Sequence, residues 1–384
     1  MDFSLKFLFY GCLFTLLYIY FGYPFLIWLI GVVKSQKVKK GDYLPSVSII
    51  ISAYNEEKTI EETIENKLSL NYPKERLEVI VISDSSTDQT DILVKKYEGQ
   101  GIRLLRQEPR LGKTAALNMA VPAAKGEIII FSDANSKYEH EAIRKLVRNF
   151  NDPAVGYVTG KMIYVNPDGT IIGDGCTAYM RYENFLREME TNIGSIVGVD
   201  GAIDAIKKEL YRPMNLDQLP DFVLPLKVIE QGYRVVYEPE AIVKEPSLKT
   251  SSDEYKMRVR VSLRALWALV DLRHLLNFKK YKIFSWELLS HKWLRYLSFL
   301  FLIGIYFSNL LLWKQNGFFK IFFLLQNLTY ILAILAFILE KQGKKVEWLY
   351  LPFFFTLIHL SSARAFIKLI LGQKQAIWEP RKGT

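Results

Sequence analysis

A run of 27 residues without a charged side chain, Phe7 to Val33, constrains this chain most. About 20 apolar residues suffice to cross the hydrocarbon core of a bilayer, so the run is long enough to span a membrane. A single cation, Lys6, precedes it, and no small-residue cleavage site follows, which is not typical of a secretory signal peptide. We therefore expect a membrane anchor that remains in the protein.

Three further apolar blocks lie near the C-terminus, at Tyr296–Trp313, Ile321–Leu339 and Trp348–Ala363. Arg364 and Lys368 closely follow the last block, so its pattern fits both a crossing helix and one at the interface. Lysines flank the segment between the first block and the others, and the positive-inside rule predicts that this segment is cytoplasmic. These lysines are Lys34, Lys37, Lys39, Lys40, Lys279, Lys280 and Lys282.

The predicted organisation is a multi-pass protein of the cell (plasma) membrane with a cytoplasmic domain. Residues 1–40 form the first transmembrane helix and its basic flank, and residues 41–250 form the cytosolic domain. Residues 251–290 form amphipathic interfacial helices, because the basic stretch Ser251–Leu276 has an apolar face that suits headgroups. Residues 291–384 form a transmembrane region of about three helices.

The formal net charge of +10 favours a partner with negative charge. Because the cations cluster beside the apolar blocks and no nucleic-acid motif is present, we expect membrane lipids rather than a nucleic acid. Two cysteines, Cys12 and Cys176, and four scattered histidines offer no disulfide framework and no metal-ligand spacing.

Strand and helix patterns alternate through the first part of the cytosolic segment. Short apolar runs of this kind are typical of strands buried on both faces, and the alternation predicts a doubly wound, mostly parallel sheet of the α/β class. The predicted strands are 47–53, 77–82, 102–105 and 127–132, with helices at 59–70, 88–97 and 112–124. Further strands are expected at 155–165 and 234–243, and helices at 179–189 and 221–230.

Polar clusters follow three of these strands, at 52–57 (SAYNEE), 83–88 (SDSSTD) and 132–135 (SDAN). In a parallel sheet all three strand ends lie along one edge, where α/β proteins bind ligands. Each cluster alone is also compatible with an ordinary turn. Together with Lys113, which starts the next helix, they predict a nucleoside-diphosphate pocket in which Asp133 and Asn135 offer oxygen ligands to a divalent cation.

Gly112-Lys113-Thr114 suggests a Walker A loop, but that motif needs a glycine five positions before Gly112. The residue there is Gln107, so an ATPase or GTPase is not expected.

The ordered motifs resemble family 2 glycosyltransferases, in the membrane-integrated branch of the cellulose, hyaluronan and poly-β-1,6-N-acetylglucosamine synthases. The resemblance covers about residues 46–245. It rests on SAYNEE at 52–57, ISDSSTDQT at 82–90, RLGKTAALN at 110–118, FSDANS at 131–136, GVDGAIDAIKKEL at 198–210 and PDFVLPLKVIEQGYRV at 220–235.

The resemblance implies a GT-A-type nucleotide-sugar-binding domain joined to transmembrane helices. It implies that Asp221 is the catalytic base and that Mg²⁺ or Mn²⁺ binds at Asp133 and Asn135. The resemblance further implies that the donor is a UDP-sugar and that it contacts Ala53, Tyr54, Glu56, Asp84, Lys113, Asp133 and Arg260.

Three departures from the family pattern bear on function. Asn135 replaces the second aspartate of the DxD pair, and Pro220 replaces the glutamate of the TED motif. Met257 and Val261 replace the Gln and Trp of the QxxRW motif around Arg260, a motif that supports processive synthesis in the family. Asp221 itself is retained, although an aspartate at this position also suits a helix N-cap.

The leading expectation is an inverting, metal-dependent transferase that moves a sugar from a nucleotide-sugar to a growing polysaccharide. An alternative is transfer of one sugar to a polyprenyl-phosphate lipid carrier, and a third is a catalytically silent subunit of an export complex. The acceptor is accordingly a glycan or a lipid-linked molecule, and an export partner or self-association is compatible with the few predicted spans. The segment Ser290–Arg295 is expected to anchor the chain at the membrane interface.

Overall fold

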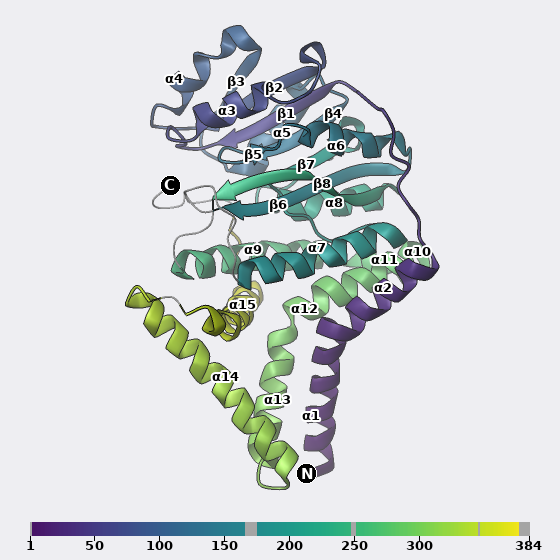
Figure 1. Ribbon diagram of the computed structural model, residues 1–384, viewed down its shortest axis with the longest axis vertical. Helices are drawn as coiled ribbons and strands as arrows, with labels where there is room; N and C mark the ends of the chain where they lie inside the picture. Colours follow the sequence, from purple (N-terminus) through teal and green to yellow (C-terminus); the bar gives the residue numbers. More distant parts are fainter. Residues whose placement is uncertain (1, 166–174, 247–250, 345, 376–384) are drawn as a thin grey trace.

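The computed structural model describes residues 2–165, 175–246, 251–344 and 346–375. A domain built on one sheet forms one half of the molecule, and long helices extend from it to the opposite end, where the N-terminus lies (Figure 1). Helices α7 and α9 lie between the two halves.

The sheet has eight strands in the order β3-β2-β1-β4-β7-β6-β8-β5. The first four neighbours are parallel, whereas β7 is antiparallel to both β4 and β6. A mostly parallel α/β sheet was predicted and is confirmed. The strands are β1 (Val47–Ala53), β2 (Leu77–Asp84), β3 (Ile102–Gln107), β4 (Ile128–Asp133), β5 (Lys137–Tyr138), β6 (Val155–Val165), β7 (Ile203–Lys207) and β8 (Arg234–Pro246).

Helices cover both faces of this sheet. Successive side chains of a strand point to opposite faces, so Ile50 packs into one apolar cluster while Ile49 and Ile51 pack into the other. The first cluster includes residues of α5 (Lys113–Ala123), α8 (Pro220–Glu230) and α9 (Ser251–Asp271). The second includes residues of α3 (Ile60–Leu68), α4 (Thr90–Lys95) and α6 (Ala142–Val147).

The helical half begins with α1 (Asp2–Leu17), which continues through a π-helical turn at Tyr18–Gly22 into α2 (Tyr23–Val33). Together these residues form one apolar helix long enough to cross a membrane, as do α14 (Gly317–Lys341) and Trp348–Ile370 of α15 (Glu347–Ile370). A fourth span forms if α13 (Ser298–Leu312) is counted with the helix before it, from which it bends by 55°. These helices correspond to the four predicted apolar blocks.

Four helices connect or support these parts. Helix α7 (Gly175–Ile193) packs against α2, and α10 (Phe278–Tyr281), α11 (Ile283–Glu287) and α12 (Leu294–Tyr296) lead from α9 to α13. Gly304 of α13 lies against α1, where an added Cβ would come within 2.7 Å of Cys12 Sγ.

Helix α15 runs beside α9 in the same direction. Arg258 near the start of α9 lies over the Phe354 ring, with 4.6 Å between its guanidinium carbon and the ring centroid. Towards the end of α9, Trp267 Nε1 donates to the carbonyl oxygen of Gln373 at 2.8 Å. Lys374 forms an ion pair with Asp217 of the sheet domain. Helix α15 therefore ends beside the sheet domain rather than at the far end of the helical half.

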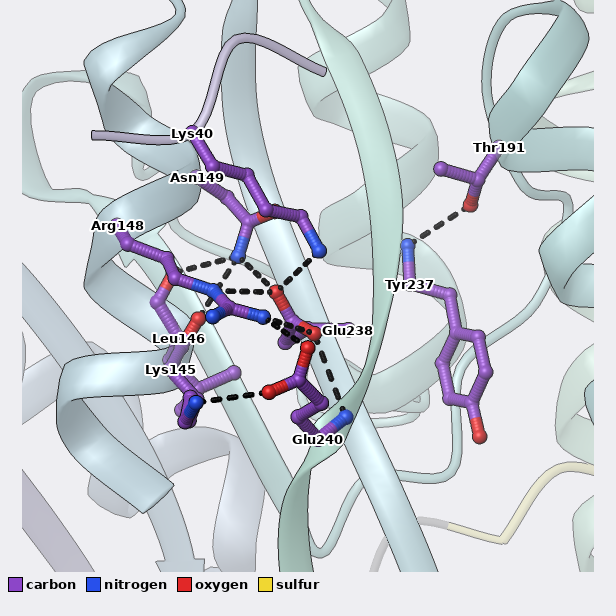
Figure 2. Close-up of polar contacts among 9 residues, drawn as sticks. All are labelled: Lys40, Lys145, Leu146, Arg148, Asn149, Thr191, Tyr237, Glu238 and Glu240. Carbon is purple, nitrogen blue, oxygen red and sulfur yellow. Dashed lines mark hydrogen bonds and ion pairs between the residues drawn. The ribbon is translucent and has the colours of Figure 1, made fainter. Parts of the chain in front are cut away.

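A buried carboxylate attaches the segment after α2 to the sheet domain (Figure 2). Glu238 of β8 is fully buried, and its carboxylate lies 2.9 Å from Lys40 Nζ and 3.0 Å from Arg148 Nη2. Asn149 Nδ2 also donates to Glu238 at 2.9 Å. Lys40 thus has a carboxylate partner in the domain, in addition to its position near the predicted membrane surface.

Candidate functional site

Three polar strand ends meet at one edge of the sheet. Strand β1 pairs in parallel with β2 and β4, and the register sets Ser52 opposite Asp133 and Ala53 opposite Ser83. Asp84 is the last residue of β2 and therefore lies at the same edge. The three clusters predicted to share an edge are thus brought together by the backbone pairing.

Asp84 holds the loop that leads into α5. Its Oδ1 and Oδ2 accept hydrogen bonds from the backbone N–H groups of Leu111 and Gly112, each at 2.9 Å. Arg110 belongs to the same loop. Its Nε lies 3.8 Å from Asp84, and its guanidinium carbon lies 3.6 Å from the centroid of the Tyr54 ring. Asp84 is buried, and its contacts fix the position of the segment that carries Lys113.

Glu56 follows β1 at the same edge. Its backbone N–H donates to Thr90 Oγ1 at 2.8 Å, and its side-chain Oε2 accepts from Thr59 Oγ1 at 2.8 Å. The preceding residue, Asn55, has a left-handed backbone with φ of 54°. This turn ties the end of β1 to the first turn of α4 and orients the Glu56 carboxylate.

Lys113 lies between two carboxylates that are far apart in the sequence. Its Nζ is 2.7 Å from Asp133 Oδ1 and 3.5 Å from Asp221 Oδ1. Burial by itself lowers the pKa of Lys113, but Asp133 and Asp221 outweigh burial and raise that pKa above its ordinary value. The side chains are 24% (Lys113), 40% (Asp133) and 28% (Asp221) exposed, so a ligand at the sheet edge can reach all three.

Asp221 occupies the first turn of α8. Leu219 is the N-cap and Pro220 the first helical residue, so Asp221 does not serve as the N-cap. Gly201, with a left-handed φ of +82°, packs so closely that an added Cβ would lie 2.4 Å from Asp221 Cγ. Burial raises the pKa of Asp221 above its ordinary value, Lys113 opposes this shift, and Asp133 adds to it. A helix N-terminus favours the ionised form of a carboxylate, and Lys113 favours the same form.

A further acidic group, Asp204, lies beneath the site and was not anticipated. It is 1% exposed in β7, opposite Thr159 of β6. Burial and the neighbouring Asp221 raise the pKa of Asp204 to about 7. An aspartate within the otherwise apolar stretch Gly201–Ile206 was the signal in the sequence, because a charged residue rarely occupies a buried strand.

An arginine that acts electrostatically on Asp221, Arg264, lies one helical turn after the predicted Arg260. Arg260 is half-buried on α9, whereas Arg264 is buried and donates to Thr114 Oγ1 at 3.1 Å and to the carbonyl oxygen of Asp217 at 3.2 Å. Arg264 also donates to the carbonyl oxygen of Gln218. Burial lowers the pKa of Arg264, and Asp221 counteracts this. Arg264 therefore joins α9 to the start of α5 and to the loop before Asp221.

A divalent cation has oxygen ligands available at the end of β4. The Asp133 carboxylate is 40% exposed and Asn135 is half-buried two residues later. Within the described parts of the chain, no group of three or more His, Cys, Asp or Glu side chains is arranged to hold a metal ion. Magnesium sites often combine one or two protein carboxylates with substrate phosphates and water, so the residues present fit an ion that binds together with a diphosphate.

Comparison with known proteins agrees with this geometry. The sequence model of "Glycosyl transferase family 2" matches residues 48–210, which include all three strand ends. The chain is 30% identical over 319 residues to the Bacillus subtilis protein described as a probable glycosyltransferase, YdaM, covering 77% of this chain and 72% of that protein.

Poly-β-1,6-N-acetyl-D-glucosamine synthase of Staphylococcus aureus is 28% identical over 225 residues, covering 57% of this chain and 54% of the synthase. The chain thus matches about half the length of this synthase. Among solved structures, a mannosyltransferase from Pyrobaculum calidifontis in complex with GDP-Man and Mn²⁺ has the same fold, with a TM-score of 0.71 at 22% identity. The match covers 94% of this chain and 99% of the mannosyltransferase chain.

Proposed function

The chain belongs to glycosyltransferase family 2, in its membrane-integrated branch, and we propose that it transfers a sugar from a nucleotide-sugar to a growing polysaccharide. The observation that supports this proposal most is the arrangement of Lys113 between Asp133 and Asp221. It combines a cation for a diphosphate, an oxygen ligand for a metal ion and a carboxylate for proton transfer at one solvent-accessible edge.

The donor in this proposal is a nucleoside-diphosphate sugar. Lys113 neutralises charge on the diphosphate, and Asp84 keeps the loop before Lys113 in position. Ala53, Tyr54 and Glu56 line the end of β1, where the base and ribose would lie. The resemblance favours UDP as the nucleotide, whereas the mannosyltransferase of similar fold holds GDP-Man, so both nucleotides belong in the test.

Asp221 is the proposed general base. A sugar hydroxyl is a weak nucleophile until a carboxylate accepts its proton, and such catalysis typically contributes about 10²–10⁴-fold. The hydroxyl oxygen attacks the anomeric carbon, its proton passes to the Asp221 carboxylate, and the nucleoside diphosphate leaves from the opposite face, so configuration inverts. Arg264 holds the loop before Asp221 through the carbonyl oxygens of Asp217 and Gln218. Arg260 lies on α9, the same helix as Arg264. A cation held by Asp133 and Asn135 would supply charge neutralisation for the leaving diphosphate.

Transfer of a single sugar to a polyprenyl phosphate is the second candidate. Met257 and Val261 stand where processive relatives have Gln and Trp, and the described chain has at most four candidate spans. A catalytically silent subunit is less consistent with the retained Asp84, Asp133 and Asp221.

Membranes containing the protein, incubated with radiolabelled UDP- and GDP-sugars, test these alternatives by the size of the product. Long polymer supports polysaccharide synthesis, and a single labelled sugar on lipid supports the carrier alternative. No transfer from any donor, by membranes in which the protein still binds a nucleoside diphosphate, would overturn the enzymatic proposal.

A further inference from the structure

The turn that carries the two candidate metal ligands is bound to a neighbouring helix. Asp133 and Asn135 lie where the chain passes from β4 to β5, in a turn closed by a hydrogen bond from the Ser136 N–H to the Asp133 carbonyl oxygen at 3.3 Å. Thr63 Oγ1 of α3 donates to the carbonyl oxygen of Ala134 at 2.6 Å. The peptide group directly before Asn135 is therefore held by a side chain of another element.

A second side chain of α3 binds the turn on the other side of Asn135. Lys67 Nζ donates to the carbonyl oxygen of Ser136 at 2.5 Å. The same ammonium group donates to Asn66 Oδ1 at 3.1 Å and lies 3.7 Å from the centroid of the Tyr138 ring, just past the turn. The residues before and after Asn135 thus both have their carbonyl oxygens bound by α3.

Lys67 occupies a position where the pattern of the helix favours an apolar side chain. Ile64 and Ile60 lie one and two turns earlier on the same face of α3, and all three residues are 0% exposed. Lysine is almost never fully buried unless its charge is paired. The buried carboxylate of Glu245 on β8 attracts the ammonium group, and it accepts a hydrogen bond from Ser136 Oγ.

Stability alone does not account for a buried lysine at this position. Desolvation of two buried charges offsets much of their attraction, and apolar side chains of similar volume are often at least as stabilising. An apolar residue in place of Lys67 would also continue the buried face of α3. The ammonium group instead makes a directed hydrogen bond to the Ser136 carbonyl oxygen, which an apolar side chain cannot make. What Lys67 contributes is therefore the position of one backbone group in the turn.

We propose that Thr63 and Lys67 are positioning residues for the divalent cation. By holding the turn, they keep Asp133 and Asn135 at the separation that a cation bound with the donor diphosphate requires. The inference rests on the proposed function and adds residues that act on the cation through the backbone. Replacing residues that orient metal ligands typically weakens metal binding by about 10- to 100-fold. Fixed geometry matters here because Asn135 is uncharged and Lys113 lies 2.7 Å from Asp133 Oδ1, so the ligands offer the cation little net negative charge.

The test uses the full-length protein in detergent and measures Mn²⁺ binding by calorimetry in saturating UDP or GDP. Thr63→Val exchanges a hydroxyl for a methyl group, Thr63→Ser retains the hydroxyl, and Lys67→Met removes the ammonium group from a side chain of similar length. Ser285→Ala is the matched control, because Ser285 Oγ is also buried and donates to the carbonyl oxygen of Leu275, outside the turn, at 2.7 Å. Nucleotide binding in the presence of a chelator and thermal unfolding are measured for each variant.

Mn²⁺ affinity is expected to fall by about 10- to 100-fold in Thr63→Val and Lys67→Met. Thr63→Ser and Ser285→Ala should bind Mn²⁺ as the wild type does, and metal-free nucleotide binding should be the same in all variants. If Lys67→Met does not fold, Thr63→Val decides the outcome by itself. Unchanged Mn²⁺ affinity in Thr63→Val, or an equal loss in Ser285→Ala, would overturn the inference while leaving glycosyl transfer intact. A wild-type protein that binds Mn²⁺ with the nucleotide but transfers no sugar would instead contradict the proposed function alone.

Discussion

Gly201 and Asp221 are in such close contact that a Cβ built on Gly201 would lie 2.4 Å from Asp221 Cγ. The glycine also has a φ of +82°, a conformation that residues with a side chain rarely adopt. The loop before β7 therefore determines where the proposed base lies, although the two residues come from different elements of the sheet domain.

Gly201→Ala is expected to lower turnover strongly, because the added methyl group must displace the Asp221 carboxylate or the loop. A shift of about 1 Å in a reacting group can reduce rate by about 10²-fold. Gly194→Ala is the matched control, since an added Cβ there meets no atom within 4 Å. Both variants are compared by kcat at saturating donor. Equal activity of the two would show that Asp221 does not depend on this contact.

Lys113→Met is expected to move the acid limb of the kcat–pH profile to higher pH. Burial raises the pKa of Asp221 and Lys113 opposes that shift, so removal of the cation raises this pKa further. A general base acts in its ionised form, and its activity is lost as pH falls through its pKa. Lys113→Arg keeps the charge and should leave the limb near its original position. An unmoved limb in Lys113→Met would argue against Asp221 as the titrating base.

Glu238→Gln is expected to lower the free energy of unfolding by about 1–3 kcal/mol, because it weakens the contacts of a buried carboxylate with Lys40 and Arg148 (Figure 2). Glu240→Gln, whose carboxylate is 54% exposed in the same network, should cost less than about 1 kcal/mol. Denaturant unfolding in detergent measures both. Similar losses of unfolding free energy in the two variants would contradict the claim that the buried carboxylate contributes more than the exposed one.

The Glu238 effect should also depend on pH. Burial by itself raises the pKa of Glu238, but hydrogen bonds from Arg148, Lys40 and Asn149 outweigh burial and lower it. When a carboxyl group has a lower pKa in the folded state than in the unfolded state, it stabilises the folded state fully at pH values above its unfolded pKa. This stabilisation is lost as the pH falls through the folded-state pKa. The difference between wild type and Glu238→Gln should therefore shrink in acid.

The packing of α15 against α9 predicts the side of the membrane on which Lys374 lies. Since Lys374 pairs with Asp217 of the sheet domain, a cysteine at position 374 should be labelled from the same side as one at position 42. A cysteine at position 315, between α13 and α14, should be labelled from the opposite side. Cys12 and Cys176 are first replaced by serine. Labelling of positions 374 and 315 from one side would contradict this arrangement.

The parallel half of the sheet was predictable because its signals are local. Runs such as Val47–Ala53 place β-branched residues on both faces of a strand, and their polar ends then share an edge by geometry alone. This pattern led directly to the prediction that Asp84, Asp133 and Lys113 belong to the site. The short antiparallel β7 has only five residues in a glycine-rich region, so it carried a weaker signal.

The remaining features depend on contacts between distant segments. Arg264 was missed because its partners, Thr114 and the carbonyl oxygens of Asp217 and Gln218, become its neighbours only when α9 packs against α5 and α8. Likewise the apolar composition of 348–363 fits a crossing helix and an interfacial one equally. The contacts between this helix and α9 determine the direction in which the helix runs.

The most direct test of the account measures turnover and nucleotide binding together in Asp221→Asn. Asparagine has nearly the same shape but cannot accept the proton of the acceptor hydroxyl. The account predicts that turnover falls by about 10²–10⁴-fold while the affinity for the donor nucleotide with Mn²⁺ is unchanged. Retained turnover, or loss of nucleotide binding along with turnover, would contradict the role of Asp221 as the base.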